Sequence, residues 1–398
     1  SGTADADVVT VDQMWNGQYF DNNWIISLDD YIKADPAVDI KDFIPQALYS
    51  LNTWRGHMVT LPIAAYAQGV MYRTDVFAEA GLDAPPSDPD KAEGWTWERY
   101  MEILGKLQGM KIGDTTLYGT VVCGAQPVPV VHMYTQLAAS RGVRWFKSFP
   151  QATWDFQPTI NSPENVEALK LYKALYNISP PESINYVWFD AGTRFAQGDI
   201  GMFFWWTPYF YLVKNEGYMS GQASVVIDKY GVGALPKSEK YPQVVSLGGW
   251  SLGIPQTAAN KDEAWQFIKW ATSAATQKKM GLVPDYNYQF SDFARLSLYE
   301  DAELKEIYPY LDTQLKLMRQ GNGKIVRPPM PIYTTLEGIY GLQINQVLAD
   351  VMSAEDSLAM TETLFNNVLS GNMLVPYRLE SYDDTLENTI ALMDSLAG

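Results

Sequence analysis

Residues 61–82 read LPIAAYAQGVMYRTDVFAEAGL, and this stretch decides the fold class. Strand-like residues run from Val59 to Ile63 at its start and again from Val70 to Tyr72. A short helix is predicted from Asp75 to Ala80, and Gly81 is the residue type that often closes a helix at its C-cap. A strand that leads directly into a helix is typical of an α/β protein.

Strand and helix signals alternate along the rest of the chain. Asp7 to Val11 (DVVTV) is a β-branched run suited to a buried strand. Thr96 is a good N-cap for a helix that begins at Trp97, and Ser162 begins another. Three further amphipathic helices are predicted at residues 260–271, 336–350 and 353–369. The alternation predicts the α/β class, and a length of 398 residues predicts two domains.

Composition excludes several function classes. The formal net charge of −17 would repel nucleic acid, so phosphate-backbone binding is a poor hypothesis. Two histidines and one cysteine are too few for a zinc site, and we found no EF-hand, phosphate-loop or dinucleotide-binding pattern. We therefore expect no metal and no cofactor. The lone Cys123 is expected to be a buried small hydrophobic residue.

The longest apolar run, Ile200 to Val213, is too short to span a bilayer and is interrupted by Pro208. No signal peptide is visible, and the first residues, SGTAD, are expected to be a mature or trimmed end.

One catalytic motif occurs, and its context argues against catalysis. Residues 249–253 (GWSLG) fit the Gly-x-Ser-x-Gly nucleophile elbow of α/β-hydrolases. That elbow needs a triad histidine later in the chain, whereas His57 and His132 both precede Ser251. Pro255 also follows where the elbow needs its helix. A glycosidase stays open as an alternative, because it needs only two carboxylates across a sugar cleft and the chain has 46 acidic residues.

Aromatic residues are unusually frequent. The chain has 13 Trp, 25 Tyr and 15 Phe residues, and such rings suit a site that grips a polar ligand through apolar faces. We expect Trp97, Trp265 and Trp270 to lie in the core, because each falls on a predicted amphipathic helix. His57 and His132 are predicted to be structural.

Five segments, in a fixed order over nearly the whole chain, resemble the family 1 extracellular solute-binding proteins, the relatives of maltose-binding protein that serve ABC sugar importers. Each segment alone is a weak signal, but the ordered set is quite specific. The segments are Ala6–Asp12 with Trp15 and Leu28–Tyr31; Leu61–Pro62 with Val70–Phe77, Ala80–Leu82 and Thr96–Glu98; Phe195–Met202; Leu247–Trp250 with Ile254, Lys261, Ala264–Trp265 and Phe267–Ile268; and Arg327–Tyr333 with Ser353–Leu358.

The resemblance implies a two-lobed periplasmic-binding-protein-like fold of type II. Crossing segments near Tyr66, Val245 and Gln320 would join the lobes, and the lobes would close on a ligand by a hinge motion. Residues 1–65 and 248–322 are expected to form the N-terminal lobe, and residues 66–247 and 323–398 the C-terminal lobe. The family usually begins with a further βαβ unit, of roughly 30 or more residues, which we expect to be missing before Asp7.

The resemblance also implies a ligand site, a function and partners. The expected ligand is a sugar, oligosaccharide or polyol, and the protein would deliver it to the permease of an ABC transporter without acting as an enzyme. We expect a monomer that lies in the periplasm or outside the cell, with lipid anchoring as an option. A sensor-coupled binding protein is the further alternative. The candidate ligand-binding residues are Gln13, Trp15, Asn16, Tyr66, Trp205, Trp206, Tyr209, Gly249, Trp250, Tyr286 and Arg327.

Overall fold

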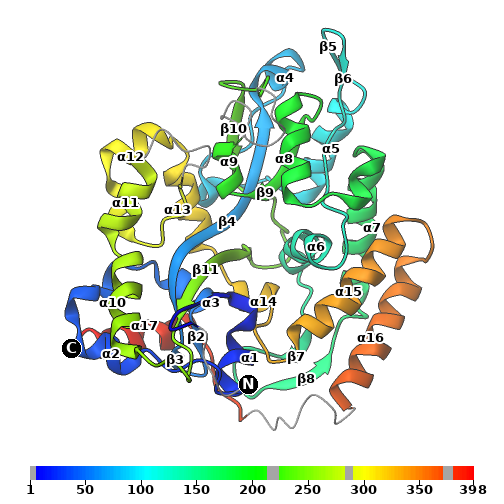
Figure 1. The fold of residues 1–398 in the computed structure, drawn as a ribbon. Coiled ribbons are helices and arrows are strands. Elements are labelled where there is room, and N and C mark those ends of the chain that lie inside the picture. The colour runs from blue at the N-terminus through cyan, green and yellow to red at the C-terminus, as the bar shows by residue number, and fades with distance from the viewer. Residues whose placement is uncertain (1–5, 213–223, 283–289, 371–379) are drawn as a thin grey trace.

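A computed structural model describes residues 6–212, 224–282, 290–370 and 380–398 (Figure 1). Its main sheet has the strand order β1–β11–β4–β10, with β9 also paired to β4, and every pair is antiparallel. These strands are β1 (Val9–Asp12), β4 (Leu61–Arg73), β9 (Met202–Trp206), β10 (Tyr230–Gly233) and β11 (Leu247–Gly253). The two strand-like stretches that the sequence suggested around residues 59–63 and 70–72 thus belong to one long strand, β4.

Strand β4 has different neighbours along its two halves. Its first half, up to Ala67, pairs with β11, which in turn pairs with β1. Its second half, from Gln68, pairs with β9 on one edge and with β10 on the other. Figure 1 shows β4 rising through the molecule, with β11 beside its lower part and β9 and β10 beside its upper part. Strand β4 therefore connects the strands β1 and β11 with the strands β9 and β10.

The predicted helices are present with boundaries that shift by a few residues. In α5 (Trp97–Leu107) the Thr96 side chain accepts the hydrogen bond of a first-turn amide, and Ser162 does the same for α7 (Pro163–Asn177). The three other amphipathic helices are α10 (Lys261–Ala271), α15 (Tyr333–Leu348) and α16 (Ala354–Ser370).

Shorter elements complete the fold. The remaining helices are α1 (Asn16–Asp21), α2 (Asp29–Ala34), α3 (Pro45–Leu51), α4 (Thr74–Glu79), α6 (Val128–Ser140), α8 (Trp188–Gln197), α9 (Pro208–Leu212), α11 (Ala274–Leu282), α12 (Ala302–Ile307), α13 (Leu311–Arg319), α14 (Gly323–Val326) and α17 (Leu386–Leu396). The small strands are β2 (Thr53–Trp54), β3 (His57–Met58), β5 (Lys111–Ile112), β6 (Thr115–Thr116), β7 (Phe146–Ser148) and β8 (Asp155–Pro158).

The aromatic core predictions are confirmed for two tryptophans and wrong for a third. Trp97 and Trp265 are buried, whereas 60% of Trp270 is exposed. Trp270 lies three residues after Phe267 on the outer face of α10, and the two rings pair with each other at 5.6 Å. Cys123 is buried, as predicted.

The C-terminal segment returns to the first elements of the chain. Helix α17 contacts α2 and α3, which Figure 1 shows at the lower left, while α16 lies on the opposite side. Just before α17, Asp384 forms a fully buried ion pair with Lys324, with Nζ and Oδ2 2.6 Å apart. Within the described part of the chain, no helix combines the length and apolar composition that crossing a bilayer requires.

Candidate functional site

An aromatic cavity of about 480 Å³ lies beside the middle of β4, and we call it the central cavity. Its size falls in the range of small-molecule sites, and its walls are mainly apolar with a few polar groups, as such sites require. Its lining residues are Asp12, Ile63, Ala64, Tyr66, His132, Trp188, Phe189, Trp206, Pro208, Tyr209, Trp250, Met280, Phe290, Asp292 and Arg327.

Strand β9 presents one of its two tryptophans to the central cavity. Successive side chains of a strand point to opposite faces, so Trp206 lines the cavity and Trp205 does not. Trp205 is fully buried, stacks behind Tyr209 at 4.7 Å and lies against Gly192. Of the three residues predicted here as ligand-binding, the structure places Trp206 and Tyr209 in the cavity wall and Trp205 in the core.

Trp250 lies on β11 and lines the cavity, and 42% of it is exposed. The pairing of β11 with β4 shifts register between Trp250 and Ser251, and a bulge of this kind redirects the local side chains. Trp15 does not line the cavity but packs edge-on against Trp250 at 6.1 Å, and its other neighbour is Tyr19. Trp15 therefore supports the exposed ring from behind.

Gly249, a predicted ligand-binding residue, does not line the central cavity and is required by the close approach of two strands. A Cβ at this position would lie 2.3 Å from the carbonyl oxygen of Ala64 on β4. Two residues further along the strand, Ser251 is buried inside β11 and accepts a hydrogen bond from Asn52 at 2.9 Å. The serine of the Gly-x-Ser-x-Gly pattern is thus a strand residue, and no strand-to-helix elbow is formed there.

Arg327 is held rigidly in the wall of the central cavity. Its Nη2 donates to the carbonyl oxygen of Leu247 at 2.7 Å, and its guanidinium carbon lies 5.3 Å from the ring centroid of Trp206. Only 2% of the residue is exposed. A guanidinium at this position can donate to ligand oxygens while it stacks on an aromatic face.

A buried polar network continues behind Arg327. Nε2 of His132 lies 2.9 Å from Oε1 of Glu337 and 3.3 Å from Nη1 of Arg327. The hydroxyl of Tyr333 also donates to Glu337 at 2.9 Å. Burial and the neighbouring Arg327 lower the pKa of His132 to about 4, so the imidazole is neutral at pH 7. His132 was predicted to be purely structural, but one side of it faces the cavity.

Two carboxyl groups face the same cavity. Burial raises the pKa of Asp12, at the end of β1, to about 6, although the charge of Arg327 opposes the rise. Asp292 is 2% exposed, and burial alone raises its pKa well above the usual range. One carboxyl oxygen of each, Oδ1, is buried and has no hydrogen-bond partner among the described residues. Tyr66, whose pKa is also raised by burial, packs edge-on against Trp206 at 5.3 Å.

Besides Trp15, Trp205 and Gly249, the candidates Gln13 and Asn16 are not found in the cavity wall. Asn16 is buried and donates from Nδ2 to the carbonyl oxygen of Leu51 at 2.6 Å. Gln13 is fully buried and lies against Gly323. Tyr286 lies outside the described residues.

Sequence reasoning missed several wall residues. Asp12 directly precedes the predicted Gln13, and Trp188 and Phe189 begin α8 after an unremarkable loop. Asp292 had no signal, because an isolated acidic residue between aromatic residues resembles any other surface carboxylate until its burial is known. The wall residues that were not predicted are Asp12, Ile63, Ala64, His132, Trp188, Phe189, Pro208, Met280, Phe290 and Asp292.

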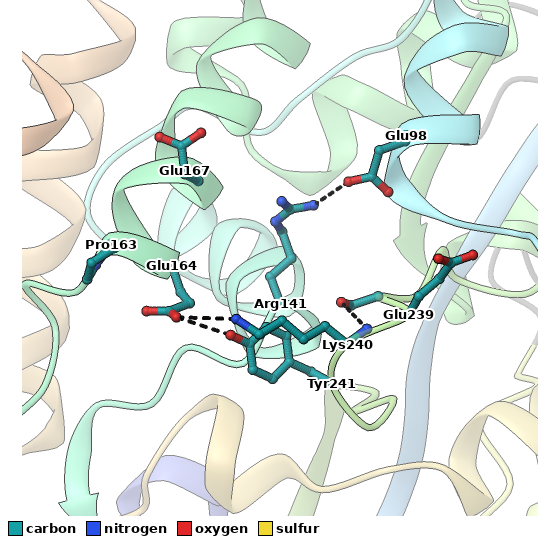
Figure 2. Close-up of a pocket in the computed structure, with 9 residues that line it drawn as sticks. Glu98, Arg141, Pro163, Glu164, Glu167, Glu239, Lys240 and Tyr241 are labelled. Atoms are coloured by element: carbon teal, nitrogen blue, oxygen red, sulfur yellow. Dashed lines mark hydrogen bonds and ion pairs between the residues drawn. The ribbon is translucent and has the colours of Figure 1, made fainter.

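A second hollow of about 440 Å³ has a different character (Figure 2). It lies between α5, α7 and residues 238–241, and it shares no lining residue with the central cavity. Its polar side chains interact with one another: Arg141 forms an ion pair with Glu98 at 3.0 Å, and the hydroxyl of Tyr241 donates to Glu164 at 3.1 Å. These satisfied, mostly exposed groups are typical of a solvated surface. Among the described residues, no group of His, Cys, Asp and Glu side chains is arranged to hold a metal ion.

The strand topology and the aromatic cavity define an α/β protein of the periplasmic-binding-protein fold. Residues 1–278 match the model of the bacterial extracellular solute-binding protein family, and the chain belongs to this family. A solute-binding protein of Agrobacterium radiobacter K84, solved with ribitol, superposes with a TM-score of 0.79 at 29% identity, covering 92% of this chain and 86% of that one. A maltose-bound protein of T. maritima shares the fold, with a TM-score of 0.76 at 22% identity, covering 92% and 85%.

Curated relatives agree with this assignment. The mannitol-binding protein of Pseudomonas aeruginosa is 27% identical over 346 residues, which are 83% of this chain and 73% of the relative. A probable ABC transporter-binding protein of Deinococcus radiodurans is 25% identical over 77% of this chain, and the match spans 66% of the relative's length.

Proposed function

We propose that this chain is the extracytoplasmic solute-binding component of an ABC transporter and captures a sugar, oligosaccharide or polyol in the central cavity. The observation that carries the proposal is the cavity wall itself. It combines stacking rings, Trp206, Tyr209 and Trp250, with the buried donor Arg327 and two carboxyl groups. Aromatic faces bind the C–H surfaces of a polyhydroxylated ligand, and the polar groups direct its hydroxyls.

The proposed ligand class is supported by the relatives. The superposed Agrobacterium protein is described as a complex with ribitol, and the Pseudomonas relative is described as mannitol-binding. Affinity near the micromolar range, about −8 kcal/mol, would allow both capture and release. We propose Tyr66, Trp206, Tyr209, Trp250 and Arg327 as ligand contacts, with Trp15 as a support for Trp250.

We propose that residues 1–65 and 248–322, together with the last helix, form one lobe, that residues 66–247 and 323–370 form the other, and that a hinge joins them. Three crossing segments lie side by side, which supports this division. The amide of Gln68 donates to the carbonyl oxygen of Ser246 at 3.2 Å, and the amide of Val245 donates to that of Gln320 at 3.2 Å. Since α17 contacts α2 and α3, the last helix is better assigned to the first lobe.

Ligand contacts from both lobes would favour the closed form, which is a shift in population. The permease of the transporter would then recognise that form, at the outer side of the membrane. A receptor that reads the closed form instead would make the protein a sensor component, with the same cavity chemistry.

A thermal-shift screen of the purified protein tests this function. The panel would contain monosaccharides, disaccharides, oligosaccharides, polyols and amino acids. We expect a saturable rise in melting temperature with at least one carbohydrate or polyol, and we expect that compound to be recovered unchanged. Consumption of the compound would favour the glycosidase alternative, and a response to amino acids alone would contradict the ligand class.

A further inference from the structure

Asp292 is the most unusual polar group in the central cavity. Its backbone is fixed against the middle of β4, because its carbonyl oxygen accepts from the amide of Ala65 at 2.9 Å. Its side chain lines the cavity although only 2% of the residue is exposed. Asp292 is therefore a buried acidic residue that forms part of the cavity wall.

No described side chain compensates this carboxyl group. Among the described residues, its Oδ1 has no hydrogen-bond partner and no charged group counteracts the effect of burial on its pKa. The described phenols that interact electrostatically with it are those of Tyr66, Tyr299 and Tyr310, and the cavity wall also contains Asp12, His132, Tyr209 and Arg327. Tyr299 donates to the carbonyl oxygen of Phe293 at 2.9 Å, and Tyr310 donates to Ser291 Oγ at 3.0 Å, so both are engaged elsewhere.

A buried acceptor without a donor is unfavourable in the free protein and becomes favourable when a ligand supplies the donor. The contrast with Arg327 is informative, because that side chain already donates to Leu247 and lies beside His132. The arrangement thus leaves one acceptor position to be filled by the ligand.

Resting on the proposed function, we propose that Asp292 is a specificity-determining residue that accepts hydrogen bonds from the hydroxyls of a neutral polyol or sugar and gives up a proton to solvent when the ligand binds. The bond that breaks is the carboxyl O–H, its proton goes to the buffer, and hydroxyl donors of the ligand take its place. Sugar phosphates and sugar acids are disfavoured, because an anionic group would meet this carboxylate.

The linked pH dependence has a definite sign. The pKa of Asp292 is raised by burial in the free protein, and hydroxyl donors lower it again in the complex. Affinity therefore increases as pH rises through the titration of the free carboxyl group, by up to about tenfold per pH unit. Asp12, with a pKa of about 6, also faces the cavity and must be separated from this effect.

Calorimetric titration with ribitol and D-mannitol, in buffers of different ionisation enthalpy between about pH 5 and pH 9, tests the inference. We expect the wild-type protein to release a proton on binding. The variant Asp292→Asn keeps the shape of the side chain but cannot ionise. We therefore expect it to bind the ligand at least tenfold more weakly and to lose the proton release that Asp292 contributes. The variant Asp12→Asn removes the other carboxyl group of the cavity and should still release the proton that comes from Asp292.

Melting temperature without ligand provides a control for folding. At pH 8 the variant Asp292→Asn should melt at or above the wild-type temperature, because it removes an uncompensated carboxylate. Near pH 4, below the raised pKa, the difference should vanish. The variant Asp21→Asn is a matched control outside the cavity, since burial also raises the pKa of Asp21, and its ligand affinity should be unchanged.

The possible failures are distinguishable. If the wild-type protein binds a polyol and Asp292→Asn binds it equally well with the same proton release, the inference is wrong and the proposed function stands. A lower melting temperature of Asp292→Asn at pH 8 would mean that the carboxyl group serves the fold, which also overturns the inference. If the wild-type protein binds no polyhydroxylated compound, the proposed function fails and the inference fails with it.

Discussion

At the scale of single residues, the aromatic side chains of the cavity wall are of two kinds. Some are buried and stabilise the fold, whereas others have an exposed face that can contact a ligand. Trp206 is buried between Tyr66 and the guanidinium of Arg327, so its removal would disturb the core as well as the site. Trp250 has a large exposed face and packs mainly on Trp15. A substitution at Trp250 can therefore report on binding with little effect on folding.

We predict that Trp250→Ala weakens binding of the ligand by about 10- to 100-fold, corresponding to 1–3 kcal/mol of lost contact. The free energy of unfolding should change by less than about 1 kcal/mol, because the lost contacts are partly exposed. Trp270→Ala is the matched control, since Trp270 is exposed but lies on α10 away from the cavity. Calorimetry and denaturant unfolding measure both quantities, and equal affinities for the two variants would contradict the role of Trp250.

At the scale of elements, the contact between β4 and β11 is closer than side chains normally permit. Gly249 has the carbonyl oxygen of Ala64 where a Cβ would be, and that atom belongs to a backbone that cannot move independently of the sheet. The register shift that follows at Ser251 then turns Trp250 toward the cavity. The glycine therefore fixes the geometry of the site through the sheet.

Gly249→Ala is predicted to destabilise the protein by about 2–4 kcal/mol, because the new methyl group forces β11 and β4 apart. Gly338→Ala is the comparison: it lies in α15 with no atom near its Cβ position, and alanine there should stabilise by about 0.5–1 kcal/mol. Denaturant titrations of the two variants test this contrast. A neutral Gly249→Ala would show that the sheet tolerates separation at this point.

The elements were largely predictable from sequence, and the site only in part. Thr96 and Ser162 marked helix starts correctly, because capping is a local property. The strand alternation that chooses Trp206 over Trp205 depends on which face of β9 meets the cavity, and that is set by tertiary packing. The same applies to Trp270, which sits on an amphipathic helix but points outward, and to Asp292, whose burial no local pattern reveals.

At the scale of the whole molecule, the segment before the last helix is attached to elements far away in the sequence. Lys324 in α14 is fully buried against Asp384, while its Nζ also donates to Thr53 Oγ1 at 3.0 Å. The pair therefore fixes the segment before α17 to α14 and β2. Removing one partner of such a pair leaves an uncompensated charge in the interior.

We predict that Lys324→Met lowers the free energy of unfolding by about 3–5 kcal/mol at pH 7, and that adding Asp384→Leu restores most of the loss. The surface pair of Lys41 with Asp394 at 3.0 Å provides the control, and Lys41→Met should cost less than about 1 kcal/mol. Chemical denaturation of the three variants measures these energies. No recovery in the double variant would show that the lysine acts through its packing alone.

The central claim is that the protein captures a polyhydroxylated solute without changing it chemically. The most direct test is calorimetric titration of the full chain with ribitol, D-mannitol and any further hits of the thermal-shift screen. Chromatography of the recovered ligand then shows whether the compound is unchanged. The account predicts one saturable site per chain with a dissociation constant near the micromolar range and complete recovery of the compound. Absence of binding across the carbohydrate and polyol panel, or conversion of the bound compound, would contradict it.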